Sequence, residues 1–390
     1  MAELETVGEM SSGLYDRTVF DRTRALRIAM LVPPWYEVPP PGYGGLEQVC
    51  AALVDGLVAR GHRVTLIGAG TKTGTKAEFH STIAQPQFRQ LGQVMPELLH
   101  VARADRLLTD RVFDIVHDHT WAGPFLAPMR AAPTVVTAHC CPLNEFGDYL
   151  ASIDHMVSLV AISHAQRRLR PDLRWAATVH NGLNPIGPAR PEPSEGPVLW
   201  LARFSPDKGP DLAIEACREA GLPLILAGKC NEPDEHEYLR DVIRPMLGPD
   251  VELVVNADRG HTNELLAAAR CLIMPIRWQE PFGMVMVEAM AVGTPVVALN
   301  RGAVPELVIP GETGIICEDV SELPQALHDV VKIDPAACVA HVRQSYSAEM
   351  IARRYERVYR AAIASRSDLR PARAPIELRR THVGRDVVPN

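Results

Sequence analysis

The sequence predicts a two-domain α/β protein in which each domain has a parallel β-sheet covered by helices. The chain has 390 residues, which exceeds the roughly 250–300 residues at which a single hydrophobic core stops growing. From Leu26 onward, short β-branched runs alternate with amphipathic helical stretches. Strands separated by helices need crossover connections, and such connections build parallel sheets that are covered on both faces.

The first domain opens with the run Arg27–Val32, an apolar segment typical of a buried parallel strand. A helix is expected from about Leu46 to Arg60, and Gly61 is its expected C-cap. The other apolar runs of this domain are of strand length. Strands are therefore predicted at 64–67, 115–117, 134–137, 159–162 and 178–180.

The alternation restarts after the proline- and glycine-rich segment 184–196, which lacks apolar periodicity and is therefore the expected linker. Beyond it, helices are predicted at 211–220, 284–292 and 347–364, the last with one apolar face at 3.6 spacing. Strands are predicted at 198–202, 222–227, 251–255, 271–275 and 295–298. Two similar α/β halves place a cleft between the carboxyl ends of their sheets, where such folds bind ligands.

Six parts of the chain are expected from these boundaries. The start is polar and acidic, and the arginine-rich end has little apolar content, so neither is expected to join a domain core. The parts are an N-terminal extension at 1–26, a first domain at 27–183, a linker at 184–196, a second domain at 197–346, a C-terminal helix at 347–364 and a mobile tail at 365–390.

Composition and charge exclude several classes of protein. Apolar residues make up 47% of the chain and charged residues 22%, as in ordinary soluble globular proteins. The formal net charge of -7 argues against broad electrostatic binding of nucleic acid. Residues 1–26 lack the apolar segment of a secretory leader, and no apolar run approaches the ~20 residues of a membrane-spanning helix. A soluble protein is expected, and peripheral membrane contact is left open.

The eight cysteines indicate a reducing compartment. They are scattered along the chain, most lie within apolar runs, and no C-x-x-C pair appears among them. Buried reduced thiols are therefore expected rather than disulfides or a zinc site, and the protein is expected to be cytoplasmic.

A glycine-rich segment, Pro39–Glu47, directly follows the first predicted strand. Glycines allow backbone N–H groups to approach a ligand, and the helix that follows offers its positive end to an anion. The segment has neither the G-x-G-x-x-G pattern of dinucleotide-binding folds nor a P-loop lysine. Gly44 and Gly45 are therefore candidates for contact with an anionic ligand, and a plain tight turn is the alternative.

Two cations, Arg203 and Lys208, lie on the loop that leaves the first strand of the second domain. Their spacing allows both to converge on one diphosphate, with arginine gripping oxygens in a fork and lysine acting as a point charge. Two solvated surface charges are the alternative. The position at the carboxyl end of a sheet favours a ligand.

The segment Trp278–Met290 carries two carboxylates with seven residues between them. Glu280 lies on a loop after a predicted strand, and Gly283 precedes an apolar helix whose first N–H groups would face a phosphate. Glu288 lies within that helix, where an unpaired carboxylate would be costly. It needs hydroxyl or N–H partners. A ribose would supply them, and a structural glutamate bonded to the backbone is the alternative.

A single histidine, His139, ends the strand predicted at 134–137. His117, Asp118 and His119 end another strand nearby, so a metal site deserves consideration. Their spacing fits no common metal motif, and alternate residues of a strand face opposite sides of the sheet. A bound metal ion is therefore not expected.

Taken together, these segments resemble the retaining family 4 glycosyltransferases, which have the GT-B fold of two Rossmann-like domains facing each other across a cleft. The resemblance runs from about Leu26 to Ala364 and implies a C-terminal helix that crosses back to the N-terminal domain. Its most specific part is the E-x7-E element from Glu280 to Glu288. The other parts, in order, are Asn181-Gly182, Arg203, Lys208-Gly209 and the runs 293–298, 302–308 and 311–314.

The resemblance implies a role for each candidate residue. Arg203 and Lys208 bind the donor diphosphate, Glu280 accepts from hydroxyls of the donor sugar, and Glu288 holds the ribose. His139 lies near the transferred sugar. The glycine loop lies near the phosphates and the acceptor, and the backbone at the start of the apolar helix contacts the distal phosphate. The remaining substrate-binding residues implied in this way are Gly44, Gly45, Phe282, Gly283, Met284 and Val285.

The implied activity is transfer of a hexosyl group from a nucleotide-sugar donor to a hydroxyl acceptor, with retention of configuration. No cofactor or metal is expected, because no D-x-D motif lies between predicted strands and the cationic pair takes the place of a divalent ion. UDP-glucose and UDP-N-acetylglucosamine are favoured as donors on family frequency. The alternatives are a GDP-mannose-dependent mannosyltransferase, a sugar-nucleotide epimerase of the same fold and a non-catalytic nucleotide-sugar-binding protein.

Overall fold

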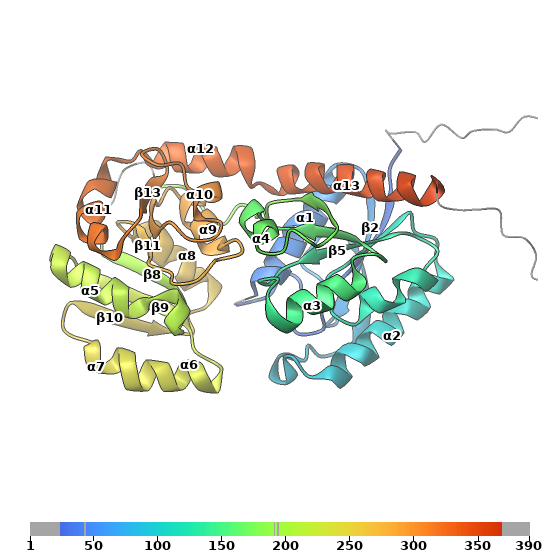
Figure 1. Cartoon of the computed structure of the whole chain (residues 1–390), viewed down its shortest axis with the longest axis horizontal. Helices are drawn as coiled ribbons and strands as arrows, with labels where there is room; N and C mark the ends of the chain where they lie inside the picture. Colours follow the sequence, from blue (N-terminus) through green and yellow to red (C-terminus); the bar gives the residue numbers. More distant parts are fainter. Residues whose placement is uncertain (1–23, 43, 191, 193–194, 369–390) are drawn as a thin grey trace, which may run out of the picture.

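The computed structural model describes residues 24–42, 44–190, 192 and 195–368. These residues form two parallel β-sheets, one in each half of the chain, with helices packed around each sheet (Figure 1). The first sheet has the strand order β3-β2-β1-β4-β5-β6-β7 and the second has the order β10-β9-β8-β11-β12-β13. The predicted fold class is therefore confirmed.

The sheet of the first half is centred on β1 (Arg27–Leu31), which pairs in parallel with β2 and β4. All its residues after Arg27 are buried, as the apolar run predicts. The other strands are β2 (Arg63–Ala69), β3 (Glu78–Ile83), β4 (Ile115–Asp118), β5 (Thr134–Ala138), β6 (Ser158–Ala161) and β7 (Trp175–Thr178). The α-helices are α1 (Gly45–Ala59), α2 (Val94–Asp110), α3 (Asn144–Ile153) and α4 (His164–Leu169).

The second half repeats this plan around β8 (Val198–Arg203), which pairs with β9 and β11. The other strands are β9 (Leu224–Lys229), β10 (Val251–Val255), β11 (Leu272–Met274), β12 (Val296–Leu299) and β13 (Gly314–Cys317). The α-helices are α5 (Pro210–Ala220), α6 (Pro233–Tyr238), α7 (Arg244–Met246), α8 (Arg259–Ala268), α9 (Met284–Ala291), α10 (Val304–Leu307), α11 (Leu323–Asp329) and α12 (Pro335–Ser345).

The final helix, α13 (Ala348–Asp368), leaves the second half and packs along α1 of the first half (Figure 1). Its residues Tyr355 and Tyr359 are fully buried in the core of the first half. The hydroxyl of Tyr359 lies 2.8 Å from Nδ1 of His117, and the hydroxyl of Tyr355 lies 2.6 Å from Oγ1 of Thr137. The predicted crossing back is confirmed, and the helix continues four residues past its expected end at 364.

Three strands differ from the sequence-based expectation. β3 and β13 lie at the outer edges of the two sheets and were not predicted. β3 has the sequence EFHSTI, with too many polar residues to form an apolar run. β7 ends at Thr178, where the expected strand 178–180 was to begin. Edge strands are partly exposed, so their sequences carry a weaker hydrophobic signal than central strands.

The two chain ends and the segment between the sheets fall partly outside the described residues. Most of the extension (1–23) and of the tail (369–390) is not described, whereas Leu26 is fully buried. From 179 to 197 the described residues form no helix and no strand beyond one bridge between Leu183 and Ser347. Within the described part of the chain, none of the helices is long and apolar enough to span a membrane.

Candidate active site

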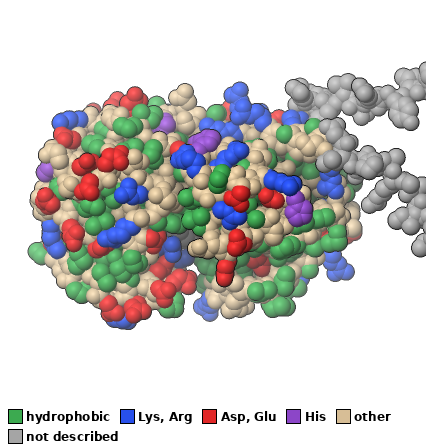
Figure 2. All heavy atoms as spheres, viewed as in Figure 1, with side chains coloured by type: hydrophobic (Ala, Val, Ile, Leu, Met, Phe, Trp, Pro, Cys, Tyr) green, Lys and Arg blue, Asp and Glu red, His purple; other side chains and the backbone are tan. Residues whose placement is uncertain are grey.

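A cavity of about 700 Å³ opens between the two halves, beside the carboxyl ends of both sheets. In the space-filling view the halves meet along a seam that has acidic and basic side chains on either side (Figure 2). Both halves contribute to the lining of the cavity. The predicted site residues in this lining are Gly44, Gly45, Arg203, Lys208, Glu280, Gly283, Met284, Val285 and Glu288.

The first half contributes the glycine loop and the start of α1. Gly44 is the N-cap of α1, and a Cβ atom there would lie 2.7 Å from Cγ of Pro40, so a larger residue does not fit. A Cβ at Gly45 would meet no atom within 4 Å, because this residue faces the cavity. Behind the loop, Glu47 is buried, and burial raises its pKa to about 7.

The two predicted cations reach the cavity from β8 and the short helix after it. Arg203 ends β8, and Lys208 is held in place because the indole N–H of Trp200 donates to its backbone carbonyl at 3.0 Å. Each cation is paired with a carboxylate of the same half: Arg203 with Glu235 at 3.3 Å, and Lys208 with Glu280. An anionic ligand would share these cations with the carboxylates or replace them.

Glu280 lies at the centre of a small polar cluster. Its Oε2 is paired with Lys208 and also accepts from Nε1 of Trp278 at 3.0 Å. Nζ of Lys208 lies 4.5 Å from the centroid of the Trp278 ring, within range of a cation–π interaction. Lysine and carboxylate are therefore held next to each other at the edge of the cavity.

The helix α9 begins at the cavity as predicted. Gly283 is its N-cap at φ 91, a left-handed conformation that favours glycine. The first N–H groups of a helix have no acceptor within it, and they carry the positive end of its dipole. Met284 and Val285 line the cavity at this point, so the start of α9 can hold one phosphate.

Glu288 has a partner that the sequence analysis did not identify. Its Oε1 accepts from a guanidinium N–H of Arg259 at 2.9 Å, and the side chain is 13% exposed. Arg259 opens α8 and also lines the cavity. The need for a polar partner was foreseen, and in this structure the partner is an arginine. Contact of Glu288 with a ribose stays a prediction.

Phe282 does not line this cavity. It is 2% exposed, and its ring packs against His180 at 5.9 Å and Tyr346 at 6.1 Å between ring centroids. Its contact with substrate therefore stays a prediction. The buried ring of Phe282 anchors the loop that carries Glu280, because it packs behind that loop.

His139 also lies outside the lining of this cavity, directly after β5. Its Nε2 lies 2.8 Å from Nδ1 of His119, whose ring centroid is 4.0 Å from that of His117. Burial lowers the pKa of His139 to about 4 and lowers the pKa of His117 and His119 well below the usual range. All three rings are neutral near pH 7, so His139 can exchange hydrogen bonds but offers no positive charge.

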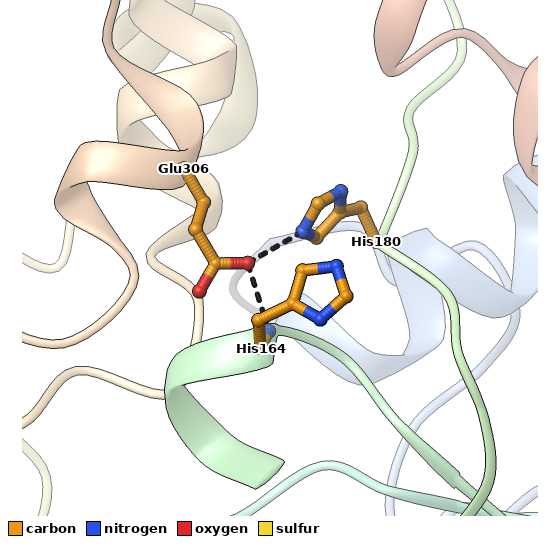
Figure 3. A group of neighbouring side chains, drawn as sticks. All are labelled: His164, His180 and Glu306. Carbon is orange, nitrogen blue, oxygen red and sulfur yellow. Dashed lines mark hydrogen bonds and ion pairs between the residues drawn. The ribbon is translucent and has the colours of Figure 1, made fainter. Parts of the chain in front are cut away.

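Three side chains of metal-ligand type meet at another place, where Glu306 is already hydrogen-bonded to His180. Among the described residues, ligand atoms of His164, His180 and Glu306 lie within 4.8 Å of one another (Figure 3). His117 and Asp118, which the sequence analysis considered, are engaged otherwise: Nε2 of His117 lies 2.8 Å from Oγ1 of Thr137, and Asp118 is paired with Arg130 at 2.9 Å.

The sequence analysis missed several residues of the cavity. Tyr36, Lys229, Asn256 and Arg259 line it, and the first three also line an adjoining cavity of about 510 Å³. Lys229 ends β9 and Asn256 directly follows β10. Like Arg203 at the end of β8, they lie at the carboxyl ends of parallel strands. The argument that selected Arg203 from the sequence would therefore have selected them too.

Comparison with family models assigns both halves. Residues 43–207 match the model described as "Glycosyltransferase Family 4" and residues 190–335 match that described as "Glycosyl transferases group 1". Together the two matches cover residues 43–335, which include every predicted site residue.

Curated relatives agree with this assignment. The chain is 28% identical over 377 residues to the glycogen synthase of Mycobacterium tuberculosis H37Rv, covering 80% of this chain and 88% of that protein. It is 26% identical to the phosphatidyl-myo-inositol mannosyltransferase of Mycobacterium leprae, covering 89% of this chain and all of that protein.

Solved structures with the same fold are also glycosyltransferases. AviGT4, an enzyme involved in avilamycin A biosynthesis, superposes with a TM-score of 0.66 at 23% identity, covering 87% of this chain and 98% of AviGT4. HepE from Anabaena, in complex with UDP and glucose, superposes with a TM-score of 0.65 at 19% identity, covering 86% of this chain and all of HepE. The chain therefore belongs to the family 4 glycosyltransferases of the GT-B fold and is an enzyme of that class.

Proposed function

We propose that this enzyme transfers a hexosyl group from a nucleotide-sugar donor to a hydroxyl acceptor with retention of anomeric configuration. One observation carries the proposal. A single cavity brings together the glycine loop of the first half, the cations Arg203 and Lys208, the start of α9 and the carboxylate of Glu288. The glycine loop, the cations and the start of α9 suit the diphosphate of a nucleotide sugar, and Glu288 suits its ribose.

The proposed chemistry is electrostatic. The bond between the anomeric carbon and the diphosphate oxygen breaks, and the leaving group gains negative charge. Arg203, Lys208 and the N–H groups of Met284 and Val285 stabilise that charge as it develops. The acceptor oxygen attacks on the face that the diphosphate leaves, and its proton passes to the departing phosphate. Glu280 accepts from hydroxyls of the sugar, and the neutral His139 can hydrogen-bond near it.

The same arrangement supports a reaction without a divalent ion. In metal-dependent transferases a cation neutralises the diphosphate. Two side-chain cations and a helix N-terminus line the cavity, and they would supply that positive charge here. The all-thiol state of the eight cysteines, six of them buried, favours the cytoplasm as the place of action.

UDP-glucose or UDP-N-acetylglucosamine is the proposed donor. Support comes from HepE, whose structures hold UDP, glucose and UDP-glucose. A GDP-mannose-dependent mannosyltransferase is the second candidate. Support comes from the Mycobacterium leprae relative, a mannosyltransferase whose full length is covered by the match.

A thermal-shift screen with UDP, GDP, ADP and TDP and their sugars tests the donor. A ligand at 100 times its Kd stabilises a protein by about 2.7 kcal/mol, which gives a clear shift in Tm. We expect UDP to give the largest shift, and a larger shift with GDP would support the mannosyl donor instead. The stabilising nucleotide sugar is then incubated without acceptor. Slow hydrolysis supports a transferase, isomerisation of the sugar supports an epimerase, and an unchanged donor supports a binding protein.

A further inference from the structure

A carboxylate of the second half binds the first half just behind the loop that carries Glu280. This loop, residues 278–283, is called the donor loop below. Glu306 lies on α10, and its side chain reaches α4 and the segment after β7 (Figure 3). Oε2 accepts from the backbone N–H of His164 at 2.8 Å and from Nε2 of His180 at 2.8 Å. Oε1 accepts from the backbone N–H of Ala165 at 2.6 Å. Both oxygens are thus used by donors of the other half.

These bonds are of the strong, charge-assisted kind. The side chains of Glu306 and His180 are only 14% and 19% exposed. Burial by itself would raise the pKa of Glu306, but hydrogen bonds from His180 and from the N–H groups of His164 and Ala165 outweigh it, and the pKa is lowered. Glu306 is therefore ionised near pH 7, and hydrogen bonds to an ionised acceptor are about twice as strong as neutral ones.

The turn that leads into α10 also carries the donor loop. The backbone N–H of Ala303 donates to the carbonyl of Glu280 at 2.9 Å, and that of Gly302 donates to Oε1 of Gln279 at 2.8 Å. Gly302 has φ 56, and a Cβ atom there would overlap the backbone of Glu280. The turn and the donor loop are therefore in direct backbone contact, and a movement of one displaces the other.

The far side of the donor loop is joined to the same place. Phe282 packs between His180 and Tyr346, and the hydroxyl of Tyr346 donates to the carbonyl of Glu306 at 2.7 Å. The two chain segments that connect the halves also meet here, since the N–H of Leu183 donates to the carbonyl of Tyr346 at 2.9 Å. Glu306 thus adds a hydrogen-bonded link between the halves beside these two connecting segments.

We propose that Glu306 is a positioning residue that couples the approach of the two halves to the placement of Glu280. Its carboxylate binds the first half, and the turn before it binds the donor loop. The loop is then fixed against the donor sugar only while the halves are together. The inference rests on the proposed function, because it concerns the contact between Glu280 and the sugar.

The test compares Glu306→Gln with the wild-type chain for kcat, donor KM and the Kd of UDP. We expect kcat to fall by about ten- to a hundredfold, the loss typical for hydrogen bonds to a charged group. The Kd of UDP should stay constant, because the cations, α9 and Glu288 all belong to the second half. Loss of fold alone would change both quantities together. An unchanged kcat would overturn the inference.

Matched variants separate positioning from general damage. His180→Gln keeps an N–H donor facing Glu306 and should retain most activity, whereas His180→Leu removes the donor and should behave like Glu306→Gln. Glu312→Gln changes an exposed glutamate of the same half and serves as the control. Equal activity of the two His180 variants would contradict the proposed role.

A readout without catalysis keeps the inference separate from the proposed function. Hydrogen exchange of the His164 and Ala165 amides should become faster in Glu306→Gln, while exchange in the two sheets stays unchanged. Small-angle scattering should show a more open arrangement of the halves in the same variant. Unchanged exchange and unchanged scattering would overturn the inference even if no donor were turned over. If exchange and scattering both change in Glu306→Gln but the wild type neither transfers nor hydrolyses the sugar, only the proposed function is contradicted.

Discussion

Lys208 and Glu280 form an ion pair at the edge of the cavity, although 72 residues separate them in the sequence. The pair lies beside Trp278, whose indole N–H donates to the same carboxylate. When a diphosphate takes up Lys208, Glu280 loses its cationic partner and its oxygens become available to hydroxyls of the donor sugar. On the proposed function, the ion pair therefore keeps both side chains in position at the edge of the cavity until a donor binds.

Loss of the cations should slow turnover strongly. On the proposed function, Arg203→Ala and Lys208→Ala each remove a group that stabilises the departing diphosphate, and losses of order 10²–10³-fold in kcat are typical for such groups. The measurement is donor turnover at saturating acceptor, with Arg218→Ala as the control, since Arg218 is an exposed arginine of the same half paired with Asp250. A double variant that kept more than about a tenth of wild-type turnover would refute the assignment of this loop.

Activity should survive chelation. Arg203, Lys208 and the start of α9 line one cavity, and on the proposed function they neutralise the diphosphate without a metal ion. Turnover measured after extensive dialysis against EDTA is expected to match that of the untreated enzyme. Full loss with EDTA, reversed by Mg²⁺ or Mn²⁺, would show that the cations do not suffice.

Substitution of Glu288 should weaken nucleotide binding without slowing the chemical step. A hydrogen bond to a charged group contributes roughly 1.5–3 kcal/mol, so Glu288→Gln should raise the Kd of UDP about ten- to a hundredfold. The ribose lies away from the breaking bond, so KM should rise while kcat stays close to that of the wild type. Glu280→Gln should instead lower kcat, because that residue is assigned to the reacting sugar.

The ion pair with Arg259 sets the control for this measurement. Glu288→Gln also leaves the Arg259 guanidinium without its carboxylate. Arg259→Met removes the pair from the other side and keeps the Glu288 carboxylate. If both variants weaken UDP binding equally, the pair matters rather than a ribose contact, and Glu288 is a structural carboxylate.

The stability of the protein should depend on Glu47 in a defined pH window. Burial raises the pKa of Glu47 from 4.5 to about 7. Between these values the folded chain holds a proton that the unfolded chain releases, so this residue lowers stability as pH rises from 4.5 to 7. Glu47→Gln should therefore gain stability over the wild type above pH 7, by on the order of 3 kcal/mol, and little below pH 4.5.

Thermal unfolding at pH 4.5 and pH 8 measures the effect of Glu47→Gln. The exposed Glu349, at the start of α13, provides the control substitution Glu349→Gln, which should show no such difference. A gain in Tm that is the same at both pH values would mean that Glu47 is not buried as described.

The elements predicted best from the sequence are those with a strong local signal. β1 is buried after Arg27 and β8 is buried over Val198–Trp200, both are mainly apolar runs, and α13 has one apolar face at helical spacing. β3 and β13 are edge strands with mixed or short sequences, so periodicity did not reveal them.

The part of the candidate site that lies at or after the carboxyl ends of strands could be predicted from the sequence. Arg203 ends β8, Glu280 and Gly283 lie on the loop after β11, and all three line the cavity. Their partners could not be read in the same way. Glu288 pairs with Arg259 across 29 residues, and Lys208 pairs with Glu280 across 72. No local pattern fixes such pairings, since they depend on which loops meet at the edge of the sheet.

The position of α13 has a consequence for how the protein is made. Tyr355, Tyr359 and their neighbours complete the core around α1 and β5, yet they are among the last described residues of the chain. During synthesis the first half therefore emerges with that apolar surface uncovered, and its core is closed only after the second half and α13 have been made. Residues 24–183 expressed alone would expose the same surface, whereas a direct fusion of 348–368 to them would cover it.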